Sequence, residues 1–433
     1  MRFLYFIMYY ILNYTLRLYF RNIKIHNKPS KYGKTIFVSN HAASFMDPLV
    51  IAAFNRSVVY FLTRSDVFTS FTKPIFWTAH MLPIYRKRDG VNTKEKNNEV
   101  FIKCTETLLR NRSLLIFGEG VTDDKFIRRL KSIKKGALRI GFTTLEACNW
   151  KEKVYVAAIG CNYSNPSRFG SDLLIKNSKP ILLNEYKEEY LENPSKVISR
   201  LTLKIQEVLK NELTHLEEIE NTEYHERIMM IQRKGMVDTF SNRPNLSERW
   251  NYSSDLASRI NEGSIKVTDD IKGEIDSYFN KLKDKDISDD LLYDSTRNPF
   301  STSQFLIQIL SLPIAVLGFI HCSLFYFSIK QFVEKKFRRD VFWGSTKLIM
   351  MIFIAGPINL LVLLFLPTLI GWPLSVLYFL GIPFFGYIFH KTIGFWMRVY
   401  KIQNLKSQNL IKLQEERARL KQNLDNFVEF KKI

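Results

Sequence analysis

The chain has 433 residues and a formal net charge of +21 at pH 7, from 63 Lys and Arg against 42 Asp and Glu. This length leaves room for a full α/β domain and a further region. The cysteines are Cys104, Cys148, Cys161 and Cys322. They lack metal-ligand spacing and suit a reducing compartment, so neither a disulfide framework nor a metal centre is expected. No Walker-type loop, Gly-x-Ser-x-Gly elbow or nucleic-acid motif is present, so anionic lipid headgroups explain the positive charge better than nucleic acid does.

The first segment, residues 3–20, is aromatic and apolar but includes Asn13, Thr15 and Arg17. These polar side chains favour a helix that lies at the membrane interface over one that crosses the bilayer. No small-residue cleavage site follows, so a cleavable signal peptide is not expected. We therefore assign residues 1–22 to an N-terminal interfacial membrane helix.

Strand-type runs alternate with helical patterns between residues 33 and 215. Strands are expected at 34–39, 58–63, 114–117, 154–160 and 172–176, and helices at 94–111, 135–148 and 194–216. This alternation predicts an α/β domain, with a mixed sheet covered by helices, over residues 33–215. Residues that follow strand ends in such sheets often meet at one rim, where ligands bind.

The residues after the first of these strands include a candidate general base. His41 follows the run Thr35–Val38, and Asp47 lies six positions further on. Six residues of continuous helix would turn the two side chains about 120° apart, so both cannot lie inside one helix. Asp47 and Pro48 are instead typical of an N-cap and a first helical residue, which leaves His41 on the preceding loop within reach of the carboxylate. The alternative is a helix cap beside an ordinary loop histidine.

A histidine paired in this way can act as a base near neutral pH. The carboxylate bonds to one ring nitrogen and fixes the tautomer and the ring position, and the other nitrogen can then remove a proton. No third catalytic residue is needed if the nucleophile arrives with the substrate.

Three further blocks follow in order: Leu82–Asp89, Gly118–Thr122 and the strand Val154–Ile159. With His41 and Asp47 they resemble the glycerophospholipid acyltransferase family, enzymes that acylate glycerol 3-phosphate or lysophosphatidic acid. The resemblance covers about residues 33–190. The five residues between His41 and Asp47 are similar to the spacing in one subgroup. Gly118 stands where the family usually has proline, and His80 stands where its second block usually has glycine.

The resemblance implies a role for each block. His41 and Asp47 would be catalytic, and Arg86 would hold the acceptor phosphate, since its guanidinium can grip a phosphate by two hydrogen bonds. Glu119 would hydrogen-bond acceptor hydroxyls or orient Arg86, while Gly118 and Gly120 would let the backbone approach a ligand or simply form a turn. A solvated arginine in a basic run is the alternative for Arg86. The other phosphate-binding candidates are Arg64, Arg129, Lys134 and Lys135.

The function expected from these residues is acyl transfer in phospholipid synthesis. The acyl thioester donor, acyl-CoA or acyl-carrier protein, would be a co-substrate, and no cofactor or metal is expected. The acceptor would be glycerol 3-phosphate or 1-acylglycerol 3-phosphate. The alternative is a catalytically silent membrane scaffold or lipid-binding protein on the same fold.

The C-terminal half is directed to the membrane. Residues 216–300 are polar and poor in apolar periodicity, which indicates a charged helical insert or linker. Within a membrane region at 301–400, the segment 305–329 is apolar but broken at Pro313, so it either spans or is re-entrant. Residues 348–389 contain no charged side chain, which predicts a hairpin of two spans over 348–390 with its turn at Gly371–Pro373.

The tail at 401–433 is a charged amphipathic helix. Its apolar residues at helical spacing are Leu410, Leu413, Leu420, Leu424 and Phe427. This helix could pack on the catalytic domain, form a coiled coil that makes a homo-oligomer, or lie on the membrane.

Basic residues at 330–347 and after His390 belong on the cytoplasmic side by the positive-inside rule. A thioester donor requires the catalytic domain on that side too, so the segment 305–329 should enter and return on one face. We expect a membrane protein with a cytoplasmic catalytic domain, integral through the 348–390 hairpin.

Overall fold

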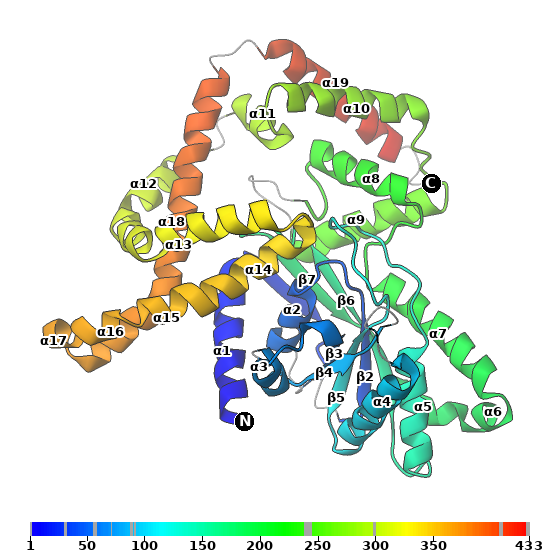
Figure 1. Ribbon diagram of the computed structural model, residues 1–433. Helices are drawn as coiled ribbons and strands as arrows, with labels where there is room; N and C mark the ends of the chain where they lie inside the picture. Colours follow the sequence, from blue (N-terminus) through cyan, green and yellow to red (C-terminus); the bar gives the residue numbers. More distant parts are fainter. Residues whose placement is uncertain are drawn as a thin grey trace. The chain divides into compact units, whose positions relative to one another are not determined.

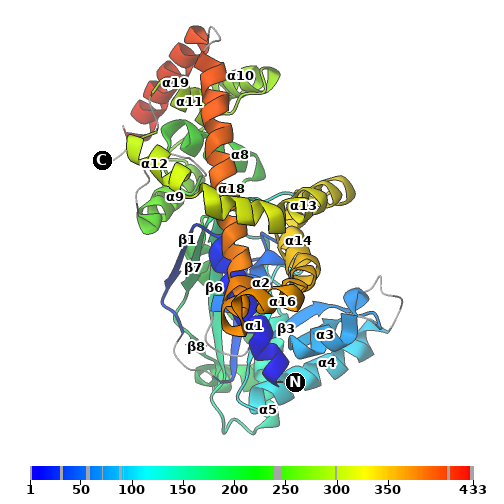
Figure 2. The same cartoon turned by 90° about the vertical axis from the view of Figure 1, so that its left-hand side faces the viewer.

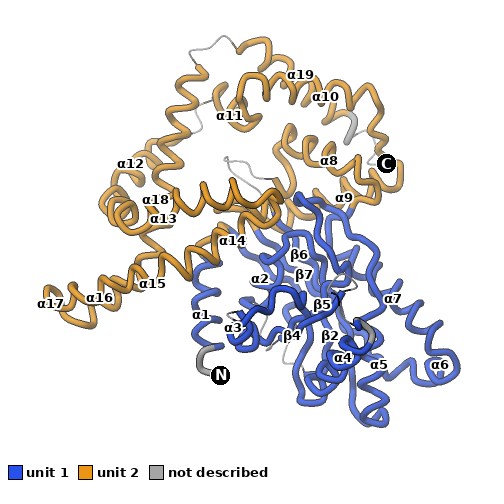
Figure 3. Tube along the Cα trace, in the orientation of Figure 1, with its two compact units in different colours: residues 1–17, 22–163, 173–215 blue, residues 18–21, 164–172, 216–433 orange. Residues whose placement is uncertain are grey.

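The structure is a computed structural model that describes residues 2–29, 33–54, 59–70, 72–86, 90, 92–237, 245–297, 300–406 and 410–429 (Figure 1). Three residues of the second sequence block, Lys87, Arg88 and Asp89, lie outside this part of the chain. The chain divides into two compact units (Figure 3). The first comprises residues 1–17, 22–163 and 173–215, and the second comprises residues 18–21, 164–172 and 216–433.

The first unit is built on an eight-stranded sheet of order β1-β7-β6-β2-β5-β3-β4, with β8 paired to β6. The strands are β1 (Asn22–His26), β2 (Thr35–Ser39), β3 (Val59–Arg64), β4 (Met81–Ile84), β5 (Ser113–Phe117), β6 (Tyr155–Tyr163), β7 (Asp172–Asn177) and β8 (Ile181–Leu182). Neighbours from β6 through β4 run parallel, whereas β7 and β8 run antiparallel to β6. The expected mixed α/β sheet is therefore present. Strands β1, β4 and β8 were not among the strands that the sequence predicts.

Three helices cover one face of this sheet: α4 (Thr93–Leu109), α5 (Gly136–Ala147) and α7 (Pro194–Asn211) (Figure 1). Alternate residues of the central strands, such as Ile36 and Val38 in β2, are buried in the same core as these helices. This follows from the two-residue period of a strand. The helices lie close to the ranges that the sequence predicts. The other helices of this part are α1 (Arg2–Tyr19), α2 (Met46–Phe54), α3 (Thr72–Thr78) and α6 (Lys187–Glu192).

The second unit contains a helical bundle with its own core (Figure 2). Its helices are α8 (Ile219–Gln232), α9 (Leu246–Asn261), α10 (Asp269–Asp284), α11 (Asp289–Ser295) and α19 (Ile411–Glu429). Leu413, Leu420 and Leu424 of α19 are buried with residues of α8–α11. Residues 216–300 are thus helical, as expected for an insert or linker, but the sequence showed no sign of their core. The apolar faces of these helices are completed by a helix far along the chain.

The same contacts show what the C-terminal helix packs against. Four of its expected apolar residues, Leu410, Leu413, Leu420 and Leu424, lie in the bundle core, and the side chain of Phe427 lies outside the described residues. The described part of the helix thus packs on α8–α11. This is an arrangement that the sequence alternatives did not include.

Three helices among the described residues are long and apolar enough to cross a membrane: Leu312–Lys336, Asp340–Phe365 and Trp372–Lys406. The first is α13, which follows α12 (Thr302–Leu310); Pro313 lies in its first turn, so the expected break falls just before it. The second joins α14 (Trp343–Met350), a π-helical turn, α15 (Gly356–Asn359) and α16 (Val362–Phe365). The third is α18 (Trp372–Lys406), preceded by α17 (Pro367–Ile370) and by Gly371 at φ 78°. The expected turn at Gly371–Pro373 is therefore present. Helix α1, which was expected to lie at the membrane interface, is not among the three candidate spans.

These apolar helices contact one another closely. A Cβ atom added to Gly318 of α13 would lie 2.1 Å from the carbonyl oxygen of Phe385 in α18, so only glycine permits this approach. The His321 ring hydrogen-bonds the Asn359 side chain at 2.9 Å and the Tyr378 hydroxyl at 2.9 Å. One polar side chain of α13 thus links both other helices, and its two ring nitrogens are satisfied inside an apolar region.

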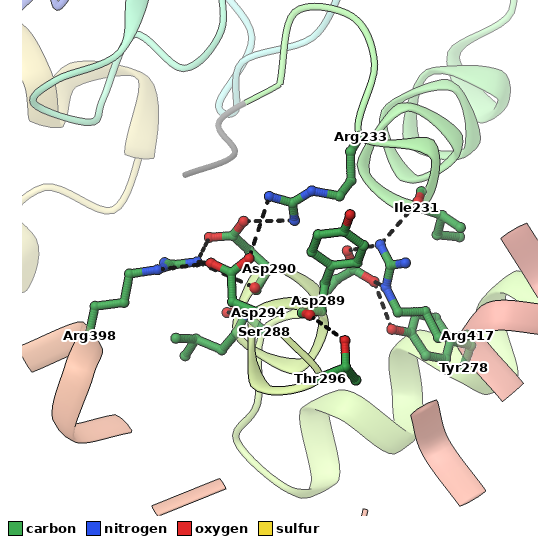
Figure 4. A network of polar contacts seen from close by, with 12 residues as sticks. Ile231, Arg233, Tyr278, Ser288, Asp289, Asp290, Asp294, Thr296, Arg398 and Arg417 are labelled. Atoms are coloured by element: carbon green, nitrogen blue, oxygen red, sulfur yellow. Dashed lines mark hydrogen bonds and ion pairs between the residues drawn. The ribbon is translucent and has the colours of Figure 1, made fainter. Parts of the chain in front are cut away.

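A buried ion pair ties α19 to the bundle (Figure 4). Nε of Arg417 donates to Oδ1 of Asp289 at 2.7 Å, and the Tyr278 hydroxyl donates to the same oxygen at 2.7 Å. Arg417 also donates to the Ile231 carbonyl. Both side chains of the ion pair are nearly inaccessible to solvent.

We predict that Arg417→Met lowers the free energy of unfolding of the second unit by about 3–5 kcal/mol, because it leaves the buried Asp289 carboxylate without its counter-charge. The matched control is Lys281→Met, which removes an exposed ion pair between α10 and Glu416, the neighbour of Arg417 on α19. This variant should change the free energy of unfolding by less than about 1 kcal/mol. Urea unfolding of the detergent-solubilised protein measures both. Equal losses would show that the buried pair does not stabilise the bundle.

Candidate active site

The end of β2 is held against β6 by a side-chain amide. Nδ2 of Asn40 donates to the Cys161 carbonyl at 3.1 Å, and the Cys161 backbone N–H donates to Oδ1 of Asn40 at 2.9 Å. The Ser39 hydroxyl donates to the Ile159 carbonyl at 2.8 Å. These bonds extend the parallel pairing past the last residue of β2 and so fix the position from which the His41 loop departs.

The expected contact between His41 and Asp47 is present. Nδ1 of His41 lies 3.1 Å from Oδ2 of Asp47, whose side chain is completely buried. The backbone N–H of Ala43 donates to the same oxygen at 2.9 Å, and the Tyr163 hydroxyl donates to Oδ1 at 2.9 Å. Three groups therefore hold the carboxylate, so both of its buried oxygens are hydrogen-bonded.

The local structure at Asp47 differs from the prediction. Helix α2 begins at Met46, so Asp47 lies in its first turn rather than at the N-cap, and Pro48 is not the first helical residue. The Asp47 side chain points back to the loop and accepts from Ala43 instead of capping the helix ahead. The two Asp47 oxygens bond to His41, Ala43 and Tyr163, and no N–H group of α2 is among these partners.

The outer ring nitrogen of His41 is available. The ring stacks on Phe117 at the end of β5, with centroids 4.1 Å apart and planes 18° apart, and 22% of the side chain is exposed. Within the described residues Nε2 of His41 has no hydrogen-bond partner. A ring that donates its Nδ1 proton to Asp47 presents a lone pair at Nε2.

Glu119 lies in the turn after β5 and anchors the same loop from the other side. Its Oε1 accepts from the backbone N–H of His41 at 2.7 Å, and its Oε2 accepts from that of Lys131 at 3.3 Å. The side chain is buried, and burial raises the pKa of its carboxyl group. Among the described residues Glu119 bonds to these two backbone N–H groups rather than to Arg86, and it so fixes the backbone of the His41 loop.

The two glycines beside Glu119 serve the turn and its packing. The Gly120 N–H donates to the Phe117 carbonyl at 3.1 Å, and Gly120 has φ 70°. A Cβ atom at Gly118 would lie 2.8 Å from the Ile133 side chain. The tight turn is thus the alternative that fits, and no ligand is needed to explain either glycine.

The candidate phosphate residues fall into separate groups. Arg64 and Arg86 both pair with Asp66, with Nη2 of Arg86 3.0 Å from the carboxylate. The hydrogen bond from Arg64 lowers the pKa of Asp66 to about 2. Arg64 ends β3 and Arg86 follows β4, and these strands lie two and three strands from β2, or about 10 and 14 Å across the sheet.

The remaining candidates lie on the segment before α5. Lys135 donates to the Ser199 hydroxyl on α7 at 2.6 Å, and the Lys134 side chain lies over Gly120. Arg129 is exposed and has no ion-pair partner among the described residues.

Arg129 also lines a small recess beside the His41 loop. The recess is formed by Asn40, Ala42, Phe126, Ile127, Arg128, Arg129, Cys161, Asn162, Leu213 and Thr214. Arg128 is buried and donates to the Tyr163 carbonyl at 2.8 Å, and the buried Thr214 hydroxyl has no hydrogen-bond partner in the described structure. The recess therefore combines a free cation and a free hydroxyl next to His41, features suited to a polar ligand.

Tyr163 is a residue of the candidate site that the sequence did not predict. Its strand was predicted to end at residue 160, but β6 continues to Tyr163 and so carries the hydroxyl to Asp47. Burial, together with the Asp47 charge, raises the pKa of Tyr163 well above its usual value, so the phenol stays a donor. In the described part of the chain no group of three His, Cys, Asp or Glu side chains could hold a metal ion.

Comparisons with known proteins add a structural likeness to solved structures. No family model matches the chain, and no characterised protein sequence matches it significantly. Among solved structures, the chain is similar to the 1-acyl-sn-glycerophosphate acyltransferase PlsC from Thermotoga maritima, with 17% identity and a TM-score of 0.30. The match covers 46% of this chain and 79% of that one.

We predict that Glu119→Gln lowers kcat by about tenfold to a hundredfold with little change in the acceptor KM. An amide has one acceptor oxygen for two backbone N–H groups, and the loss of a charge-assisted hydrogen bond costs about 1.5–3 kcal/mol. Steady-state kinetics with varied acceptor measures both constants. A raised acceptor KM with unchanged kcat would instead indicate that Glu119 contacts the substrate.

Proposed function

We propose that the protein is a membrane-associated acyltransferase that moves a fatty acyl group from an acyl thioester to a hydroxyl of glycerol 3-phosphate or 1-acylglycerol 3-phosphate. The observation that carries this proposal is the His41–Asp47 pair, with a buried carboxylate on Nδ1 and an unoccupied Nε2. The residue blocks that resemble glycerophospholipid acyltransferases support the same reaction.

In the proposed reaction, Nε2 of His41 takes the proton from the acceptor hydroxyl as its oxygen attacks the thioester carbonyl. The C–S bond of the tetrahedral intermediate then breaks, and the leaving thiolate receives the proton from the imidazolium. Asp47 holds the ring in place and stabilises its positive charge. A general base positioned in this way contributes typically about 10²–10⁴-fold to the rate.

Direct transfer without an acyl-enzyme is favoured by the state of the nearest thiol. Cys161 is buried beside the His41 loop, and burial raises its pKa well above the usual value, so it stays protonated. A thiol that is neither ionised nor accessible is a poor nucleophile. The substrate hydroxyl is therefore the nucleophile in this proposal.

Two sites are candidates for the acceptor phosphate. Arg86 is the residue that the family resemblance favours, but Asp66 already neutralises part of its charge. The Arg129 guanidinium has no ion-pair partner among the described residues and lines the recess. Asn40 and Ala42, the sequence neighbours of His41, line the same recess. We propose Arg129 as the main phosphate-binding residue because a cation there would hold the acceptor next to the base.

The apolar helices of the second unit fit a lipid substrate or product. Three candidate spans support membrane association, and anionic headgroups match the net charge of +21. A cytoplasmic face for the catalytic domain is part of the proposal, because thioester donors are made there.

The test is an assay of the purified protein with acyl-CoA and acyl-carrier-protein donors against glycerol 3-phosphate, lysophosphatidic acid and other lysophospholipids, with the product identified by mass. We expect O-acylation of a phosphate-bearing acceptor by the wild type and at least a hundredfold loss in His41→Ala. Folding of the variant is checked by circular dichroism. Equal turnover by the folded variant, or no turnover with any pair, would contradict the proposal; the second result would favour a silent lipid-binding protein.

We predict that Arg129→Gln raises the acceptor KM by about tenfold or more, since a charge-assisted contact to phosphate is lost, while the donor KM is unchanged. Arg86→Gln is the matched comparison at the other candidate site. A larger effect in Arg86→Gln would move the phosphate to the Asp66 side of the sheet edge.

A further inference from the structure

Helix α11 joins both ends of the membrane region to one buried cluster, which we call the α11 clasp (Figure 4). Its acidic residues are Asp289, Asp290 and Asp294, and its basic residues are Arg233, Arg398 and Arg417. Nη2 of Arg398, near the end of α18, lies 2.5 Å from Oδ2 of Asp294, and Arg398 also pairs with Asp290. Arg233, which follows α8, lies 3.0 Å from Asp290. Three cations thus balance three carboxylates in a cluster with little access to solvent.

The chain beyond Arg398 stays in the same bundle. Leu405 and Leu410 are buried with residues of α8–α11, and α19 follows in the same core. Since α11 precedes the first candidate span and Arg398 lies in the last one, the two ends of the membrane region meet in one folded body.

This meeting limits how the three candidate spans can cross a bilayer. Three crossings between residues 301 and 397 would leave α11 and Arg398 on opposite faces, about 30 Å apart, and the α11 clasp could not form. Two crossings return the chain to the face from which it started. Helix α18 has 35 residues and is about 52 Å long, so its last turns extend beyond a hydrocarbon core of about 30 Å and can hold Arg398 outside it.

We propose that the segment 301–397 crosses the lipid bilayer twice, so that one of the three candidate helices does not cross and the bundle of α8–α11 and α19 lies wholly on one face. Lipid is the partner that fits these helices, because only 17–22% of each apolar window is buried inside the protein. Two crossings are favoured over none because the three candidate helices have 25, 26 and 35 residues, and each is long enough to span a bilayer. The proposal is independent of the acyltransferase reaction.

The test uses single cysteines in the full-length protein in sealed membrane vesicles of known orientation. The background variant lacks Cys148, since the other three native cysteines are buried. Asp286→Cys and Gln422→Cys report on the bundle, Arg338→Cys on the turn between the first two candidates, and Leu369→Cys on the turn between the last two. A membrane-impermeant maleimide is added from each side, and detergent-opened vesicles give the full labelling of each site.

We expect Asp286→Cys and Gln422→Cys to react from the same face, and at least one of Arg338→Cys and Leu369→Cys to react only from the other. Labelling of Gln422→Cys only from the face opposite Asp286→Cys would overturn the proposal by showing an odd number of crossings. Labelling of all four from one face would overturn it by showing none, with the apolar helices covered by another protein copy or lying flat. Neither result depends on enzymatic activity, so failure here is distinct from failure of the proposed function.

Discussion

The buried carboxylate of Asp47 is the interaction on which the candidate site depends. It has no access to solvent and accepts from the His41 ring, the Ala43 backbone and the Tyr163 hydroxyl. A carboxylate in the interior is costly unless each oxygen is hydrogen-bonded, and the three bonds that satisfy its oxygens also fix the loop, the ring and the end of β6. The same hydrogen bonds thus orient the His41 ring and stabilise the loop that carries it.

The parallel sheet explains why these groups meet. Strands β2, β5 and β6 are neighbours and run in the same direction, so their carboxyl ends lie at one edge. One end carries His41, the next carries Phe117 and Glu119, and the third carries Tyr163. Glu119 holds the His41 backbone while Asp47 holds its ring, so the histidine is restrained at both ends. The outer nitrogen is left to a ligand.

Local patterns in the sequence predicted strands β2, β3, β5, β6 and β7, the sheet class and the His41–Asp47 contact, because each is signalled by residues close in the chain. What the sequence did not predict depends on pairings across the sheet or the bundle. The backbone partners of Glu119 and the hydroxyl of Tyr163 require the order β6-β2-β5, and the core of α8–α11 requires α19. Asp47 was assigned to the N-cap because its residue type suits a cap, but it lies in the first turn of α2 and its oxygens bond to His41, Ala43 and Tyr163. Hydrophobicity likewise identified the apolar segments. It could not predict that Arg398, near the end of the last segment, pairs with Asp290 and Asp294 of the helix before the first one.

The most direct test of the central claim is the tautomer of His41, measured by ¹⁵N NMR on protein with labelled histidine and assigned by comparison with His41→Gln. If Asp47 accepts from the ring as described, the proton lies on Nδ1 and Nε2 is unprotonated in the neutral form of the wild type. A proton on Nε2 instead would leave no lone pair for the acceptor hydroxyl and would contradict the account.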